Sequence, residues 1–155
     1  MTPTDSARGA LLLVEHSNWR FLASYFPQLN AKRAFFNVCI DQAAYSESVP
    51  FLLMGDLNTG KNSIDVEGKG VPFVCADLFE ALSTEARLID LWRLEHGDKK
   101  ERSWRSRVNG FRVDHALANK QFMKRFIGIR CAYDHTPREN GLTDRSALIL
   151  SFNGE

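Results

Sequence analysis

The first apolar runs of the chain predict a β-hairpin. Ala10 to Val14 and Trp19 to Phe26 are rich in aliphatic and aromatic residues, and His16-Ser17-Asn18 between them is a turn-forming set. Pro27 ends the second run, because proline cannot continue a hydrogen-bonded strand. The segment from residue 10 to 26 is therefore expected to form two paired strands.

The next segment predicts a helix and then a buried strand. From Leu29 to Tyr45 the apolar side chains recur at spacings of three and four, typical of an amphipathic helix, with Asn30 as its candidate N-cap. The apolar run from Phe51 to Met54 follows. These elements complete a β-α-β unit with the second hairpin strand.

The second half of the chain alternates short apolar segments with polar ones. Residues 61–71 are expected to form a long loop, and 134–144 a polar loop. Asn109-Gly110 is a turn signal ahead of a strand. The predicted elements are a helix over 73–83 and strands over 88–92, 111–119, 126–133 and 146–152. Because strands outnumber helices, the pattern predicts an α+β fold with antiparallel pairs.

A turn-rich loop, Gly55 to Gly60, follows the strand at 51–54 and carries Asp56 and Asn58. Two positions apart at the end of a strand, these side chains point the same way and could hold a cation and a phosphate oxygen. Alternatively, they bond only to their own turn, which for an Asp-x-Asn taken alone is the more common arrangement. Both interpretations stay open from this segment.

Composition adds a charge asymmetry to this picture. With 155 residues, 44% hydrophobic and 25% charged, the chain is ordinary globular material for one domain. The net charge of +1 conceals a basic stretch over residues 99–112, where Glu101 is the only acid. That stretch fits a phosphate backbone and a solvated loop equally well. Its basic residues are Lys99, Lys100, Arg102, Arg105, Arg107 and Arg112.

The cysteines and the apolar runs indicate the cellular compartment of the protein. Cys39, Cys75 and Cys131 are an odd number without metal-ligand spacing, and their apolar or small neighbours predict buried free thiols in a reducing compartment. No segment has the pattern of a signal peptide, and no apolar run is long enough to span a bilayer. We therefore expect a cytoplasmic protein without a membrane partner.

Four sequence motifs follow one another in a fixed order. They are Tyr25-Phe26-Pro27-Gln28, Gly55-Asp56-Leu57-Asn58, Ser103-Trp104 with Gly110-Phe111-Arg112-Val113-Asp114-His115, and Leu142-Thr143-Asp144-Arg145-Ser146-Ala147-Leu148. Together they resemble the endonuclease/exonuclease/phosphatase superfamily, nearest its abasic-site endonuclease and exonuclease III-like branch. The resemblance implies a four-layer α/β/β/α sandwich. Residues 8–155 would form the C-terminal part of that domain, with a disordered tail over 1–7.

The resemblance also implies phosphoester hydrolysis assisted by a divalent cation, Mg²⁺ or alternatively Mn²⁺. By motif, Asp56 would orient or activate the attacking water, and Asn58 would hold that water or a phosphate oxygen. Tyr25 would contact the phosphate. Gln28 stands where the family usually has Asn. Asp144 would lie at the metal site.

The resemblance also implies roles for residues of the later motifs. Asp114 would orient the imidazole of a catalytic histidine, and Trp104 is interpreted as a core residue rather than a stacking platform. The residues expected on the substrate face are Gln28, Arg105, Arg107, Asn109 and Arg112.

One departure from the family pattern is Arg145, which stands at the position of the motif's histidine. An arginine can pair with Asp114 and clamp a phosphate oxygen, but it cannot exchange a proton near neutral pH. His115 and His135 are near in sequence, and His115 is expected on the opposite sheet face from Asp114. Neither is a convincing substitute.

A second departure is the short N-terminal part. The family's upstream strands supply a metal-binding Glu, and Glu15 does not fit that role because it lies inside the hairpin. An incomplete sandwich would leave strand edges and apolar surface exposed, which favours self-association.

The resemblance and the two departures from it thus imply a nuclease-like phosphoester hydrolase with impaired turnover, acting on a phosphoester such as DNA. The alternatives are a catalytically inactive phosphate- or nucleic-acid-binding remnant and a gene fragment.

Overall fold

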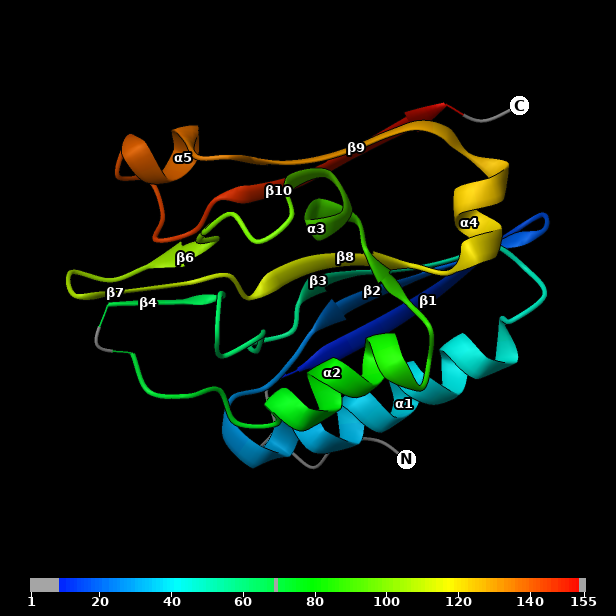
Figure 1. The fold of residues 1–155 in the computed structure, drawn as a ribbon, viewed down its shortest axis with the longest axis horizontal. Helices are drawn as coiled ribbons and strands as arrows, with labels where there is room; N and C mark the ends of the chain where they lie inside the picture. Colours follow the sequence, from blue (N-terminus) through cyan, green and yellow to red (C-terminus); the bar gives the residue numbers. More distant parts are fainter. Residues whose placement is uncertain (1–8, 69, 154–155) are drawn as a thin grey trace.

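A computed structural model describes residues 9–68 and 70–153, which build three layers (Figure 1). The predicted tail at 1–7 lies outside the described residues. A helical layer lies below a five-stranded sheet, and a two-stranded sheet lies above it. None of the described helices is both long and apolar enough to cross a bilayer.

The large sheet contains the predicted hairpin and β-α-β unit. Its order is β1-β2-β3-β8-β5; β2 and β3 are parallel, and the other neighbours are antiparallel. Both predictions are confirmed. The strands are β1 (Ala10–His16), β2 (Trp19–Tyr25), β3 (Phe51–Asp56), β5 (Ile89–Asp90) and β8 (Asp114–Ala118).

The helical layer covers the lower face of this sheet. It contains the 3₁₀ turn η1 (Leu29–Lys32), α1 (Arg33–Tyr45) and α2 (Ala76–Thr84). The predicted helix therefore begins with a 3₁₀ turn, and the prediction of Asn30 as its N-cap is wrong. The N-cap of α1 is Lys32, whose side chain makes no capping bond. Phe36 and Phe51 are fully buried in the core between these helices and the sheet.

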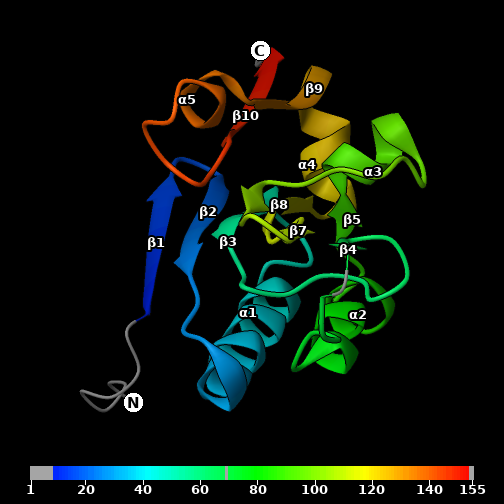
Figure 2. The same ribbon diagram turned by 90° about the vertical axis from the view of Figure 1, so that its left-hand side faces the viewer.

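The upper face packs against β9 (Ile127–Asp134) and β10 (Ala147–Asn153), as Figure 2 shows. α4 (Lys120–Arg125) and α3 (Leu91–His96) contribute Phe122 and Trp92 to this second core. On the outer face of the small sheet Ala132 and Ile149 are exposed. The described residues thus form three layers of the predicted sandwich.

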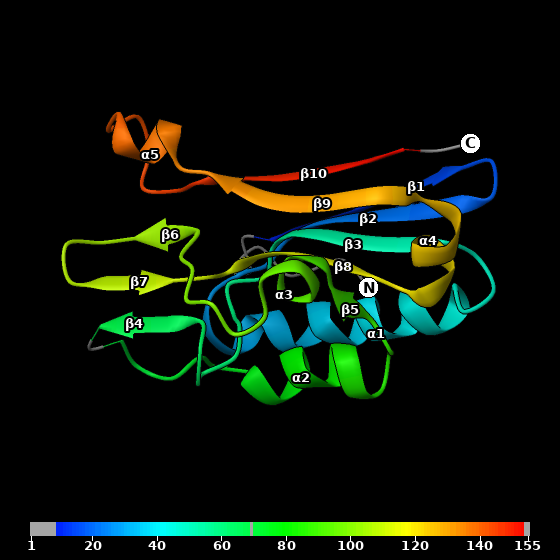
Figure 3. The ribbon, with the colours of Figure 1, turned by 45° about the horizontal axis from the view of Figure 1, so that its top comes forward.

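Three predicted loops contain regular structure. A third sheet, of order β4-β7-β6, gathers at one end of the molecule (Figure 3). It uses the segment predicted as a loop at 61–71, and it places Asn109-Gly110 inside a strand rather than in a turn. The polar loop at 134–144 contains the short helix α5. The elements are β4 (Val66–Gly68), β6 (Trp104–Arg105), β7 (Asn109–Phe111) and α5 (Thr136–Glu139).

The strand predicted at 88–92 is also shorter than expected. Strand β5 ends at Asp90, whose carboxylate accepts a hydrogen bond from the Arg93 backbone N–H at 3.0 Å and thereby caps α3. The strand predicted at 111–119 is divided between β7 and β8, because a side chain binds the backbone where the strand is interrupted. The backbone N–H groups of Val113 and Asp114 both donate to the Ser103 hydroxyl, at 3.0 and 3.1 Å.

A buried ionic cluster joins these segments beneath the third sheet. The Arg112 side chain is 0% exposed and forms ion pairs with Asp90 and, at 3.5 Å, with Asp65. Arg93 also pairs with Asp65. The imidazole of His115 lies 2.7 Å from Arg112 and 2.7 Å from the Thr59 carbonyl oxygen. Each charge in the cluster therefore has a partner, without which burial would be costly.

An exposed apolar side chain at a sheet edge and three buried cysteines were both expected from the sequence. Leu12 on edge strand β1 is 62% exposed, so the predicted exposure of apolar surface is confirmed. Self-association through such edges stays a prediction. Cys39, Cys75 and Cys131 are buried and free.

Asp90 predicts how acid destabilises the fold. Burial opposes its charge, but His115 and Arg112 outweigh that effect and lower the pKa of Asp90 to about 2. Its stabilising contribution is therefore complete above the unfolded-state pKa and lost as the pH falls through about 2. This loss amounts to about 2 kcal/mol of unfolding free energy. Urea unfolding measured from pH 5 down to about pH 2 should show a smaller loss of unfolding free energy in Asp90→Asn than in the parent chain. An equal loss in both proteins would contradict the stabilising role of the Asp90 carboxylate.

Candidate functional site

Two carboxylates face each other at the end of the central strand pair. Asp56 is the last residue of β3 and Asp114 the first of β8, and the antiparallel register places them directly opposite. Side chains opposite each other in such a pair lie on the same face about 5 Å apart at Cβ. Two like charges at this spacing repel, so the pair needs a cation.

Arg145 supplies that cation. Its Nη2 lies 2.7 Å from Asp56 Oδ2, and its Nη1 lies 3.4 Å from Asp114 Oδ2. The expected pairing of Arg145 with Asp114 is confirmed, and the closer contact is with Asp56. Asp56 Oδ2 receives no hydrogen bond of good geometry within residues 9–68 and 70–153, so this contact is an ion pair.

The backbone at and beside Arg145 is held by hydrogen bonds. Arg145 forms an isolated β-bridge with Trp104. On either side, the Ser146 N–H donates to the Ser103 carbonyl at 2.7 Å, and the Arg105 N–H donates to the Asp144 carbonyl at 3.1 Å. The segment from 144 to 146 is thereby fixed against β6.

The pKa of Asp56 reflects these opposing influences. Burial and the charge of Asp114 raise it above its ordinary value, whereas Arg145 and the Asn58 backbone N–H act in the opposite direction. Asp56 is therefore a carboxylate whose negative charge depends on Arg145.

Asn58 is held by its neighbours. Its backbone lies in the left-handed region, with φ of 47°, and its N–H donates to Asp56 Oδ1 at 2.8 Å. The side-chain amide donates to the Phe26 carbonyl at 2.7 Å and accepts from Gln28 Nε2 at 2.6 Å. The interpretation that Asp56 and Asn58 bond within their own turn therefore describes part of the site.

Lys32 is a site residue that the sequence did not reveal. It is 2% exposed, and its ammonium donates to the Asn58 carbonyl and to Thr59 Oγ1. Burial lowers its pKa, although Cys75 and Asp56 act against this. A lysine at the start of an amphipathic helix ordinarily lies in solvent, so only the tertiary structure shows that it supports the loop.

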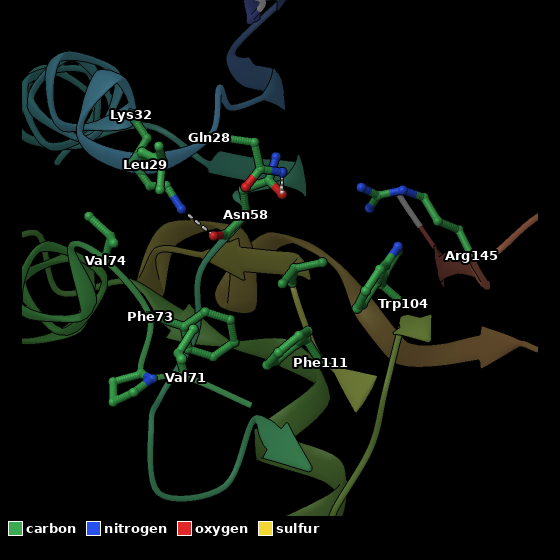
Figure 4. Close-up of a pocket in the computed structure, with 12 residues that line it drawn as sticks. Gln28, Leu29, Lys32, Asn58, Val71, Phe73, Val74, Trp104, Phe111 and Arg145 are labelled. Carbon is green, nitrogen blue, oxygen red and sulfur yellow. Dashed lines mark hydrogen bonds between the residues drawn. The ribbon is translucent and has the colours of Figure 1, made fainter. Parts of the chain in front are cut away.

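A pocket of about 330 Å³ opens beside these residues (Figure 4). Trp104 and Phe111 form one wall with their rings stacked, centroids 5.5 Å apart. Trp104 Nε1 also donates to Asp144 Oδ2 at 2.7 Å. Trp104 was interpreted as core, but it is only partly buried and lines the pocket. The remaining lining residues are Gln28, Leu29, Lys32, Asn58, Val71, Pro72, Phe73, Val74, Val113 and Arg145.

A second groove, of about 1120 Å³, is lined by residues of β6, α5 and the segments that flank them. Its charged lining consists of four arginines, Arg102, Arg105, Arg107 and Arg138, and three acids, Glu101, Glu139 and Asp144. We call it the basic groove because arginines are in excess. Burial is the main cause that lowers the pKa of Arg138; Arg102 and Arg105 add to this effect, and Glu101 and Glu139 act against it. The structure thus brings Arg105 and Arg107 together with two further arginines.

Other predicted site residues are placed differently. Arg112 does not line the open face, because its side chain is directed into the buried ionic cluster. Asn109 lies on β7 and lines a smaller recess with Arg105 and Arg107. Tyr25 is 51% exposed and stands beside Asp56 in the parallel pair of β2 and β3. His115 faces the α2 side of the sheet, as expected, in contact with Phe79.

The residues present do not fit a divalent cation between Asp56 and Asp114. Such a cation prefers several oxygen ligands, and a guanidinium already contacts both carboxylates. Within the described part of the chain, no group of three or more His, Cys, Asp or Glu side chains is arranged to hold a metal. Asp144, which the resemblance places at the metal site, accepts a hydrogen bond from the Trp104 indole, and its metal role stays a prediction.

Comparison with solved structures identifies similar folds. An AP endonuclease from Archaeoglobus fulgidus is 20% identical, with a TM-score of 0.70; the match covers 92% of this chain and 65% of that one. A 3'-5' exonuclease, NExo, from Neisseria meningitidis is 17% identical, with a TM-score of 0.69, and the match covers 92% and 64% of the two chains. NExo described as a 3' phosphatase bound to product DNA hairpin is 15% identical, with a TM-score of 0.71 and the same coverage.

These matches show that the described residues share the fold of an AP endonuclease and of NExo, and they confirm the fold expectation drawn from the resemblance. The chain spans less than two thirds of the length of each structure. No protein-family model and no curated protein matches the sequence.

Lys32 gives a test of how the site is supported. In Lys32→Met the Asn58 carbonyl loses its charged donor, so we expect a loss of about 1–3 kcal/mol in unfolding free energy. Urea unfolding measures it. Lys61→Met is the matched control, because Lys61 is exposed on the following segment. Equal stabilities of the two variants would contradict the supporting role.

Proposed function

We propose that this chain is a nuclease-like phosphoester hydrolase domain that binds phosphoesters but turns them over weakly. The fold, shared with an AP endonuclease and a 3'-5' exonuclease, supports the first part. The observation that carries the second part is the ion pair from Arg145 to Asp56 and Asp114.

Arg145 affects binding and turnover in opposite ways. A guanidinium has five N–H donors, so those not directed at the carboxylates can bind a phosphate oxygen. Hydrolysis needs Asp56 to orient a water and a further group to transfer a proton. Asp56 Oδ2 is occupied by Arg145, which keeps its proton near neutral pH. General acid-base groups contribute about 10²–10⁴-fold, so turnover should be low by that order.

The arrangement of surfaces favours a nucleic-acid substrate. Arg145 lines the apolar pocket, with Trp104 and Phe111 available to contact a sugar or base. The basic groove, which borders Asp144, would hold neighbouring phosphates of a strand. One of the similar structures is bound to a product DNA hairpin. The resemblance implies magnesium dependence. We do not propose it for this chain while Arg145 contacts both carboxylates.

An Arg145→His variant tests the cause of weak turnover. Histidine restores a side chain that can exchange a proton, so hydrolysis of an abasic-site duplex and of bis(p-nitrophenyl) phosphate with Mg²⁺ should rise by about 10²-fold or more. Adding Asp56→Asn should abolish the gain. A parent chain that hydrolyses as fast as Arg145→His contradicts the proposed role of Arg145. No turnover in either protein contradicts the hydrolase assignment and leaves the inactive binding module.

The binding module is the second candidate, supported by the four arginines of the groove. Arg105→Gln or Arg107→Gln should weaken binding to an uncleaved DNA duplex and reduce the slope of log K against log salt by about one each. Fluorescence anisotropy over a salt series measures this. Arg125→Gln removes the same charge from α4, at the other end of the molecule (Figure 1), and should leave the DNA affinity and its salt dependence unchanged. Equal effects of all three substitutions would contradict a binding site in the groove and would indicate non-specific attraction of DNA to the whole protein.

A further inference from the structure

The carboxylate pair has the placement of a cation site but already contains a cation. Asp56 and Asp114 are opposite in register, and Asp56 Oδ2 is buried without a hydrogen bond of good geometry in the described part of the chain. An oxygen of this kind is an available ligand for a hard cation. The Nη2 of Arg145 lies 2.7 Å from it and already places a positive charge beside this oxygen.

Arg145 cannot leave this position easily. Its positive charge is permanent at any working pH, and the backbone bonds at Ser146 and at Asp144 fix its segment against β6. A divalent ion entering the pair would meet the guanidinium charge at short range in a partly buried place. It would also find two carboxylates rather than three, since Asp144 is bonded to Trp104.

We infer that Arg145 is a built-in counter-cation that opposes the binding of divalent metal ions at the Asp56–Asp114 pair, and that removing its charge raises the affinity of the pair for Mg²⁺ or Mn²⁺. The inference deepens the proposed function, on which its meaning for phosphoester chemistry rests. Cation binding itself can be measured whether or not the chain hydrolyses anything.

Mn²⁺ is the probe, because its electron paramagnetic resonance signal reports free ion directly. Arg145→Gln should bind one Mn²⁺ with an affinity about tenfold or more above that of the parent chain, since the net charge of the pair changes from −1 to −2. Mg²⁺ should compete for the same ion. Arg107→Gln is the control: it removes one charge from the exposed groove and should leave Mn²⁺ affinity within about twofold of the parent.

A second substitution assigns the new site. Arg145→Gln with Asp56→Asn should lose the gained Mn²⁺ affinity, whereas Arg145→Gln with Lys61→Met should keep it. If Arg145→Gln fails to fold by circular dichroism, Arg145→Gln with Asp114→Asn relieves the repulsion. This double variant should bind Mn²⁺ more tightly than Asp114→Asn alone, because the two proteins differ only by the charge of Arg145.

The inference is overturned if the parent chain binds Mn²⁺ as tightly as Arg145→Gln, or if the gain survives Asp56→Asn. Failure of the proposed function looks different: Mn²⁺ binding follows the expected order in all variants, but neither the parent nor Arg145→His cleaves a phosphoester.

Discussion

Two negative charges stand opposite each other at the end of the central strand pair, and the structure around them keeps one positive charge between them. The register of β3 and β8 fixes the carboxylates of Asp56 and Asp114. The contacts of residues 144–146 with 103–105 fix Arg145. Because those contacts also form the end of the pocket and the side of the basic groove, the charge arrangement and the binding surface are built from the same segments.

The site therefore combines an apolar pocket, an arginine-rich groove and a pair of carboxylates. Aromatic rings and aliphatic side chains line the pocket, the groove has more arginines than acids, and Arg145, which contacts the carboxylates of Asp56 and Asp114, lies at the pocket. Such a surface favours holding a phosphoester over transforming it, since the donors for binding are present and the proton-exchanging group is not. The Lys32 ammonium below Asn58 adds rigidity to the loop that carries the site.

Local patterns predicted the elements whose contacts are local. The hairpin of β1 and β2 and the β2-α1-β3 unit were recognisable because their apolar spacing matches the period of the structure. The third sheet was missed, since β4, β6 and β7 are two or three residues long and are stabilised by pairing between distant segments. Motif order placed Asp56, Asp114 and Arg145 correctly relative to one another, but the direction of the Arg112 side chain depends on Asp65 and Asp90, which no local pattern connects to it.

Both large cores contain buried thiols: Cys39 and Cys75 in the core below the large sheet, and Cys131 in the core above it. Cys39 packs between α1 and the large sheet, and Cys131 packs between the two sheets. Burial raises the pKa of each to about 12. Alkylating reagents attack the thiolate, so neither cysteine should react while its own layer stays closed. The chain thus carries a natural chemical reporter on each side of its central sheet, and the order in which the two thiols become modified records which layer separates first.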